Sequence, residues 1–101
     1  MNAKSVMAAA SLNDIFRKLG WQSYKLSAFP TSNAREVDIQ YRSSKYGTLR
    51  SVTCDAAGLL RWLNQNFSTF GVRRRLLELL DRKEERETSQ MDTPEIPNLF
   101  S

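Results

Sequence analysis

Three consecutive arginines at residues 73–75 are the longest uninterrupted basic run in this 101-residue chain. Guanidinium groups bind phosphate with paired hydrogen bonds, so adjacent arginines indicate an anionic partner. The surrounding pattern places them in the first turn of a helix, where the helix dipole favours anions over cations. Their presence therefore favours contact with phosphate, although an ordinary helix with a charged exposed face is the alternative.

A second basic group is expected at the tip of a β-hairpin, in the segment SSKYG at residues 43–47. A basic tip that carries an aromatic ring can lie in a groove of a nucleic acid or stack on a base. Hairpin tips are also polar simply because they are exposed. From both clusters, the predicted nucleic-acid-binding residues are Arg42, Lys45, Tyr46, Arg50, Arg73, Arg74 and Arg75.

Enzyme chemistry finds little support in the residue types. The chain has no histidine, which excludes the histidine-based triads and dyads. Its single cysteine, Cys54, has no second thiol or imidazole with which to share a zinc ion and is expected to be a small buried residue. Glu36 and Asp38 alternate along one strand and are expected to face water. We therefore expect no enzyme activity, no cofactor and no metal site.

Composition and charge indicate one globular domain with an uneven charge distribution. Apolar residues make up 41% of the chain, which suits a packed core. Residues 1–75 hold twelve basic and four acidic residues, whereas residues 76–101 hold three basic and seven acidic ones. A basic body with an acidic tail is typical of proteins that meet nucleic acid, and equally of small domains with a solubilising tail. One cysteine, no long apolar run and no secretory signal predict a cytoplasmic protein without a membrane span.

The elements that must position these residues follow from hydrophobic periodicity. A helix is predicted over residues 11–19, capped by Ser11 with Asp14 completing an imperfect capping box, and ended by Gly20. An earlier start in VMAAAS, residues 6–11, is the alternative, although no cap marks it. Residues 21–29 alternate and predict a strand. The strongest signal is REVDIQYR, residues 35–42, whose period of two predicts a half-buried strand. Its predicted buried residues are Val37, Ile39 and Tyr41, and its predicted exposed residues are Glu36, Asp38 and Gln40.

Residues 35–54 form a predicted hairpin, with Gly47 free to take a positive φ in the turn. Asp55 is the predicted cap of a helix whose buried face is Ala56, Leu59, Leu60, Leu63 and Phe67. STFG, residues 68–71, interrupts it, and a last helix is expected from about Val72 to Glu87. On its exposed side, Arg74–Glu78 and Glu78–Arg82 are spaced to form i, i+4 ion pairs.

The order helix, strand, strand, strand, helix, helix predicts an α+β fold in which a three-stranded antiparallel sheet packs against helices in two layers. The domain is expected to span residues 1–87, with a tail at 88–101. The last two predicted helices, joined by STFG at residues 68–71 and with arginines at the start of the second, resemble a helix-turn-helix in outline. The element order also resembles that of double-stranded-RNA-binding domains. However, residues 54–62, CDAAGLLRW, lack the lysines with which that family grips phosphate, so its function is not carried over.

The tail ends in three large apolar residues, Ile96, Leu99 and Phe100, after an acidic stretch. Its terminal NLF is similar to the peptides that dock on replication sliding clamps, although the leading glutamine of those peptides is missing. These residues either bind a larger protein partner or fold back on the domain, and fold-back is our expectation. The predicted function is a small, non-enzymatic, nucleic-acid-binding accessory or regulatory protein. The alternative is an adaptor or inhibitor, of the type that mobile elements encode, docking on a larger host protein through a helix face or the tail.

Overall fold

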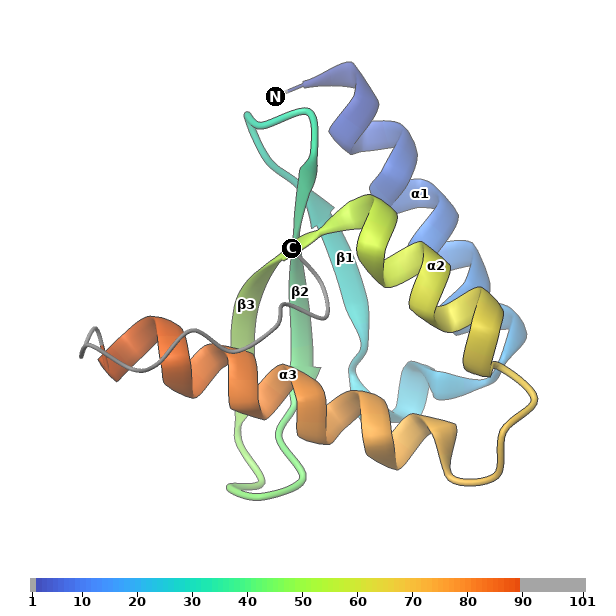
Figure 1. Cartoon of the computed structure of the whole chain (residues 1–101), viewed down its shortest axis with the longest axis vertical. Helices are drawn as coiled ribbons and strands as arrows, with labels where there is room; N and C mark the ends of the chain where they lie inside the picture. The colour runs from blue at the N-terminus through green and yellow to red at the C-terminus, as the bar shows by residue number, and fades with distance from the viewer. Residues whose placement is uncertain (1, 90–101) are drawn as a thin grey trace.

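The computed structural model describes residues 2–89, and its first element is a long helix, α1 (Ala3–Lys18) (Figure 1). This helix begins well before Ser11 because Asn2 is the N-cap, its side chain accepting a hydrogen bond from the Lys4 amide at 2.8 Å. The predicted capping box is therefore wrong. Asp14 lies inside the helix and instead pairs with Arg17 at 2.7 Å and with Lys18 at 3.1 Å.

The strand predicted for residues 21–29 is mostly a 3-10 turn, η1 (Trp21–Tyr24), followed by the short strand β1 (Ser27–Pro30). Two left-handed residues bound the turn, Gly20 with φ 74° and Lys25 with φ 59°. Gly20 was expected in this role, but Lys25 was not, because a positive φ is uncommon outside glycine. The turn buries Trp21 against Phe16, with ring centroids 6.3 Å apart.

The sheet has the order β1-β2-β3, with antiparallel pairing throughout. Strands β2 (Glu36–Arg42) and β3 (Leu49–Asp55) form the predicted hairpin, and Gly47 in its turn has φ 73°. As predicted, one face of β2 is buried and the other is more exposed. Val37, Ile39 and Tyr41 are fully buried, whereas Glu36, Asp38 and Gln40 are half-buried.

The two edges of this sheet differ. At the free edge of β1, the Asn13 side chain donates to the Ala28 carbonyl at 2.9 Å and accepts from the Ala28 amide at 2.7 Å. Pro30, the other β1 residue that faces outward, has no amide hydrogen. On β3, the antiparallel ladder directs the backbone groups of Leu49, Ser51 and Thr53 away from β2, and no strand of residues 2–89 pairs with them.

Two helices complete the chain, α2 (Ala56–Asn66) and α3 (Val72–Ser89). Asp55 caps α2 as predicted, its side chain accepting from the Gly58 amide at 2.8 Å. Phe67 was predicted on the buried face of α2, but it lies at the helix end and is 58% exposed. The predicted helix of residues 72–87 corresponds to α3.

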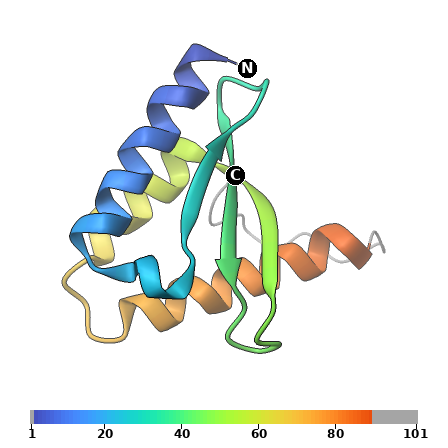
Figure 2. The ribbon, with the colours of Figure 1, turned by 180° about the vertical axis from the view of Figure 1, so that it is seen from behind.

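All three helices lie on one side of the sheet, which confirms the α+β fold and the two layers (Figures 1 and 2). Helices α1 and α2 run beside each other over one end of the strands, and α3 crosses the hairpin end (Figure 1). The core forms where they meet, from Leu12, Phe16, Ile39, Leu59, Leu63, Leu76 and Leu80, among others. Ile96, Leu99 and Phe100 lie outside the described residues, as does most of the predicted tail.

Candidate nucleic-acid interface on α3 and the hairpin

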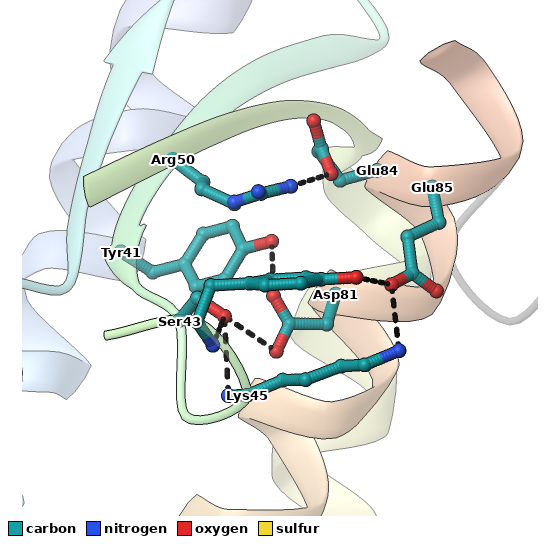
Figure 3. Close-up of polar contacts among 8 residues, drawn as sticks. Tyr41, Ser43, Lys45, Arg50, Asp81, Glu84 and Glu85 are labelled. Atoms are coloured by element: carbon teal, nitrogen blue, oxygen red, sulfur yellow. Dashed lines mark hydrogen bonds and ion pairs between the residues drawn. The ribbon is translucent and has the colours of Figure 1, made fainter. Parts of the chain in front are cut away.

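The hairpin tip is fastened to α3 through a buried carboxylate that the sequence analysis did not single out. Asp81 is only 5% exposed and accepts hydrogen bonds from the hydroxyls of Tyr41 and Ser43, both at 2.9 Å (Figure 3). Burial, followed by this hydrogen bond, raises the pKa of Tyr41 above its usual value. A carboxylate that holds two hydroxyls of the hairpin fixes the position of α3 against the turn.

Ser43 also organises the turn itself. Its hydroxyl accepts from the amides of Lys45 at 3.2 Å and Tyr46 at 2.9 Å while donating to Asp81. Its backbone closes the hairpin, with the Ser43 amide donating to Thr48 and the Gly47 amide donating to Ser43. The hydroxyl therefore uses its one proton and both lone pairs, so the turn and α3 are held by the same atom.

The cations of the hairpin are paired with two further carboxylates of α3. Arg50 donates to Glu84 at 2.6 Å, and Lys45 and the Tyr46 hydroxyl both donate to Glu85, at 3.1 and 2.6 Å (Figure 3). These bonds from Tyr46 and Lys45 lower the pKa of Glu85, and the bond to Glu85 raises the pKa of Lys45. The Arg50 guanidinium also lies 4.1 Å from the centre of the Tyr46 ring.

The tip is thus docked on a helix instead of standing free to enter a groove. Lys45, Tyr46 and Arg50 are brought together as predicted, but their charged and polar atoms already have partners within the protein. Arg42 is exposed and donates to the Gly47 carbonyl at 3.0 Å, within the same turn. The sequence signal for this docking is the spacing of Asp81, Glu84 and Glu85, which places three acids on one side of a helix, opposite a basic turn.

The three adjacent arginines of α3 separate into two groups. Arg73 lies over the Tyr24 ring, 3.9 Å from its centre, and its buried Nε has no hydrogen-bond partner. Arg74 and Arg75 are exposed and form no ion pair within residues 2–89. Arg73 therefore has a packing role in the fold, which Arg74 and Arg75 lack.

Arg82, about two turns further along, is exposed in the same way. The predicted pairs Arg74–Glu78 and Glu78–Arg82 are not formed within the described chain, so Glu78 neutralises neither arginine by contact. At about 100° per residue, Arg75 and Arg82 lie on the exposed side of α3, opposite the leucines that face the core. Along the axis they are about 10 Å apart, at about 1.5 Å per residue.

Charge is consequently sorted by side on α3. The carboxylates of Asp81, Glu84 and Glu85 turn toward the hairpin, while Arg75 and Arg82 point to solvent. Lys83 lies on the sheet side, where it pairs with Glu87 at 3.4 Å. We call Arg74, Arg75 and Arg82 the arginine stripe. On the outer surface of α3 the exposed cations Arg74, Arg75 and Arg82 outnumber the exposed carboxylates Glu78 and Glu87.

A cleft of about 570 Å³ connects the stripe to the hairpin. Its lining unites Lys45 of the turn with Arg74 and Arg82 of α3, so the two basic clusters predicted from sequence meet in one place. Glu78, Asp81 and Glu85 also line it, so its three cations are matched by three carboxylates.

Three other features in the described residues would point to a different function: a metal site, a reactive thiol and a membrane-spanning helix. No group of three His, Cys, Asp or Glu side chains within residues 2–89 is placed to hold a metal ion. Burial raises the pKa of the Cys54 thiol to about 12, which keeps it protonated and unreactive. Across the same residues, every helix is too short or too polar to span a bilayer.

Comparison with known proteins gives no relative: no protein-family model, no curated protein and no solved structure matches this chain. Function is therefore inferred from the side chains described above.

Proposed function

We propose that this protein binds nucleic acid through the arginine stripe of α3 and acts as a small, non-enzymatic accessory or regulatory protein in the cytoplasm. The observation that supports this most directly is that Arg74, Arg75 and Arg82 are exposed and have no ion-pair partner within the described chain. Arginine is well suited to phosphate because its planar donors match the phosphate oxygens.

The position of these arginines is unfavourable for the isolated helix, which strengthens the argument. The first turn of α3 contains no acidic residue, so nothing there offsets the cations against the helix dipole. Stacking on Tyr24 accounts for Arg73. Arg74 and Arg75 have no such compensation within the fold, and an anionic ligand would supply it.

The test compares a stripe variant with a variant matched in charge. Arg75→Ala/Arg82→Ala removes two stripe residues, and Lys4→Ala/Arg35→Ala removes two exposed cations, one in the first turn of α1 and one directly before β2. The start of α1 and the turn between β1 and β2 lie at the opposite end of the molecule from α3 (Figure 1). Both changes lie on the surface and should alter stability by at most about 0.5 kcal/mol per site. Binding to a duplex and to a single-stranded oligonucleotide is then measured between 50 and 200 mM salt.

On the duplex, each phosphate contact adds about 0.9 to the magnitude of the slope of log K against log salt, so losing two should flatten the slope by about 1.8. Over a fourfold rise in salt, the affinity gap between wild type and stripe variant should shrink about 12-fold. The matched variant should keep the wild-type slope. Equal losses in both variants would show that the stripe is not the interface. No salt-dependent binding by the wild type would reject the nucleic-acid function.

A second function, docking on a larger protein, has a separate observation in its favour. The outer side of α1 carries two exposed apolar residues in adjacent positions, Val6 and Met7, flanked by exposed Ala3 and Ala10 one turn away. A helix face of this kind suits helix-to-groove docking. Capture of a partner from cell extract that survives nuclease and high salt, and that Val6→Asp/Met7→Asp abolishes, would favour the adaptor.

A further inference from the structure

The loop between α2 and α3 exposes two phenylalanines within four residues. Phe67 is 58% exposed, and Phe70 is 100% exposed. The backbone that carries them is ordered by hydrogen bonds, from the Thr69 amide to Asn66 at 2.8 Å and from the Val72 amide to Thr69 at 3.2 Å. Gly71 adopts φ 76°, which turns the chain directly into α3. The rings are therefore presented to solvent from a fixed turn at a corner of the molecule (Figure 1).

A shallow pocket adjoins the first of these rings. It holds about 220 Å³ and is lined by Ile15, Lys18, Leu19, Leu63, Asn64 and Phe67. Its walls are apolar, Asn64 offers an amide with both a donor and an acceptor, and Lys18 at the rim is paired with Asp14 at 3.1 Å. Apolar walls with one exposed amide suit a heteroaromatic ring.

The charge around this loop has one sign. From residue 56 to residue 77 the chain contains four arginines and no acidic residue. Arg74 and Arg75 follow Phe70 by about one helical turn, and both are exposed. An apolar protein surface would gain little from this excess of cations, whereas a polyanion that carries flat rings would match both the charge and the phenylalanines.

Tyr46, the aromatic residue expected from sequence to stack on a base, is less suited to the task. Its hydroxyl is held by Glu85, and the Arg50 guanidinium lies 4.1 Å from the centre of its ring. Phe70 has neither constraint.

We infer that the ligand is a single-stranded nucleic acid whose unpaired bases stack on Phe70 and against Phe67 in the adjoining pocket. Arg74 and Arg75 bind the flanking phosphates, and the Asn64 amide faces the edge of the base in the pocket. This inference depends on the proposed function, because it assigns the substrate class to the same surface and extends that surface into the loop.

The experiment uses Phe70→Ala, with Phe29→Ala as a matched control. Phe29 is 48% exposed and lies on the uncovered face of the sheet, so the control removes a partly exposed ring of the same type away from α3. Three probes are titrated at fixed salt: an oligothymidine single strand, the same length of abasic strand, and a duplex.

Loss of one stacked base should weaken oligothymidine binding by Phe70→Ala about 5-fold to 100-fold. Its salt slope should stay at the wild-type value, because no phosphate contact is removed. Binding of the abasic strand and the duplex should be unchanged, and Phe29→Ala should bind all three probes as wild type does. Phe70→Trp should restore the oligothymidine affinity, since a larger ring stacks at least as well.

Two results would overturn the inference while leaving the proposed function intact: equal loss of oligothymidine and abasic binding by Phe70→Ala, or wild-type affinity for oligothymidine in that variant. If the protein binds none of the three probes, both the inference and the proposed function are wrong. Phe70→Ala could instead leave oligothymidine binding intact and abolish the capture of a protein partner from nuclease-treated extract. That result would show that the loop is a protein-docking site and that the inference is wrong.

Discussion

Replacing Asp81 tests whether one buried carboxylate holds the hairpin to α3. Asp81→Ala leaves the hydroxyls of Tyr41 and Ser43 without this acceptor, in a region where both residues are fully buried. A buried donor left without a partner costs about 1–3 kcal/mol, so two should cost about 2–6 kcal/mol. Against a typical total stability of about 5–15 kcal/mol, that is a large fraction. For a domain of this size each kcal/mol lowers Tm by about 4–8 °C.

The assay is thermal or urea unfolding of four proteins: wild type, Asp81→Ala, Tyr41→Phe and the double variant. Tyr41→Phe removes one hydroxyl and leaves the ring in place, so the cycle isolates one bond. We expect Asp81→Ala to cost about 1–3 kcal/mol less in the Tyr41→Phe background, since one of the orphaned donors is already gone. A cost below about 1 kcal/mol for Asp81→Ala, or an equal cost in both backgrounds, would refute the clamp described here.

Two further predictions concern titratable groups. Because burial raises the folded-state pKa of Tyr41, the unfolded chain releases that proton first, so stability should fall as pH rises above about 10. Tyr41→Phe should reduce this alkaline loss, as measured by urea midpoints between pH 8 and pH 11. The Cys54 thiol, with a pKa raised to about 12, should resist a thiol reagent at pH 8 in the native protein and react at once in urea. Rapid native labelling would contradict the burial of Cys54.

The sheet and the last two helices could be predicted because their local and tertiary signals agree. Val37, Ile39 and Tyr41 alternate strictly, and burial on one face follows from that period alone. Asp55 before an apolar period of 3.6 predicts the start of α2, and its side chain caps that helix. Such signals act over a few residues, which is why one sequence suffices.

The errors came where a local pattern had two solutions. The residues WQSYKLSAF alternate as a strand would, but Lys25 takes a left-handed conformation and the segment becomes a turn that buries Trp21. Asn2 was overlooked as a cap because no strong apolar period follows it at once. Phe67 matches the apolar period of α2, yet the helix ends there and the ring extends past the core.

The sequence predicts which basic residues belong to the candidate site, but not which carboxylates they contact. The arginines and the basic turn are evident in the sequence, but their pairing with Asp81, Glu84 and Glu85 spans about forty residues of chain. The angle at which α3 packs across the hairpin determines which cations form ion pairs with those carboxylates. Arg74, Arg75 and Arg82 are the ones that this angle leaves outside.

The Asn13 amide has a consequence for how copies of this chain could polymerise. Its side chain hydrogen-bonds the outward amide and carbonyl of Ala28, which a further strand would otherwise use, so the sheet ends at β1. Within residues 2–89, only the β3 edge has outward backbone groups that could accept a new strand. Two molecules that pair their β3 strands about a twofold axis would form one continuous sheet. The outermost strand at each end of that sheet would be β1, which cannot pair further, so assembly would stop at a dimer. A single side-chain amide thus makes any edge-to-edge assembly of this protein self-limiting, where an unblocked β1 would permit an open fibre.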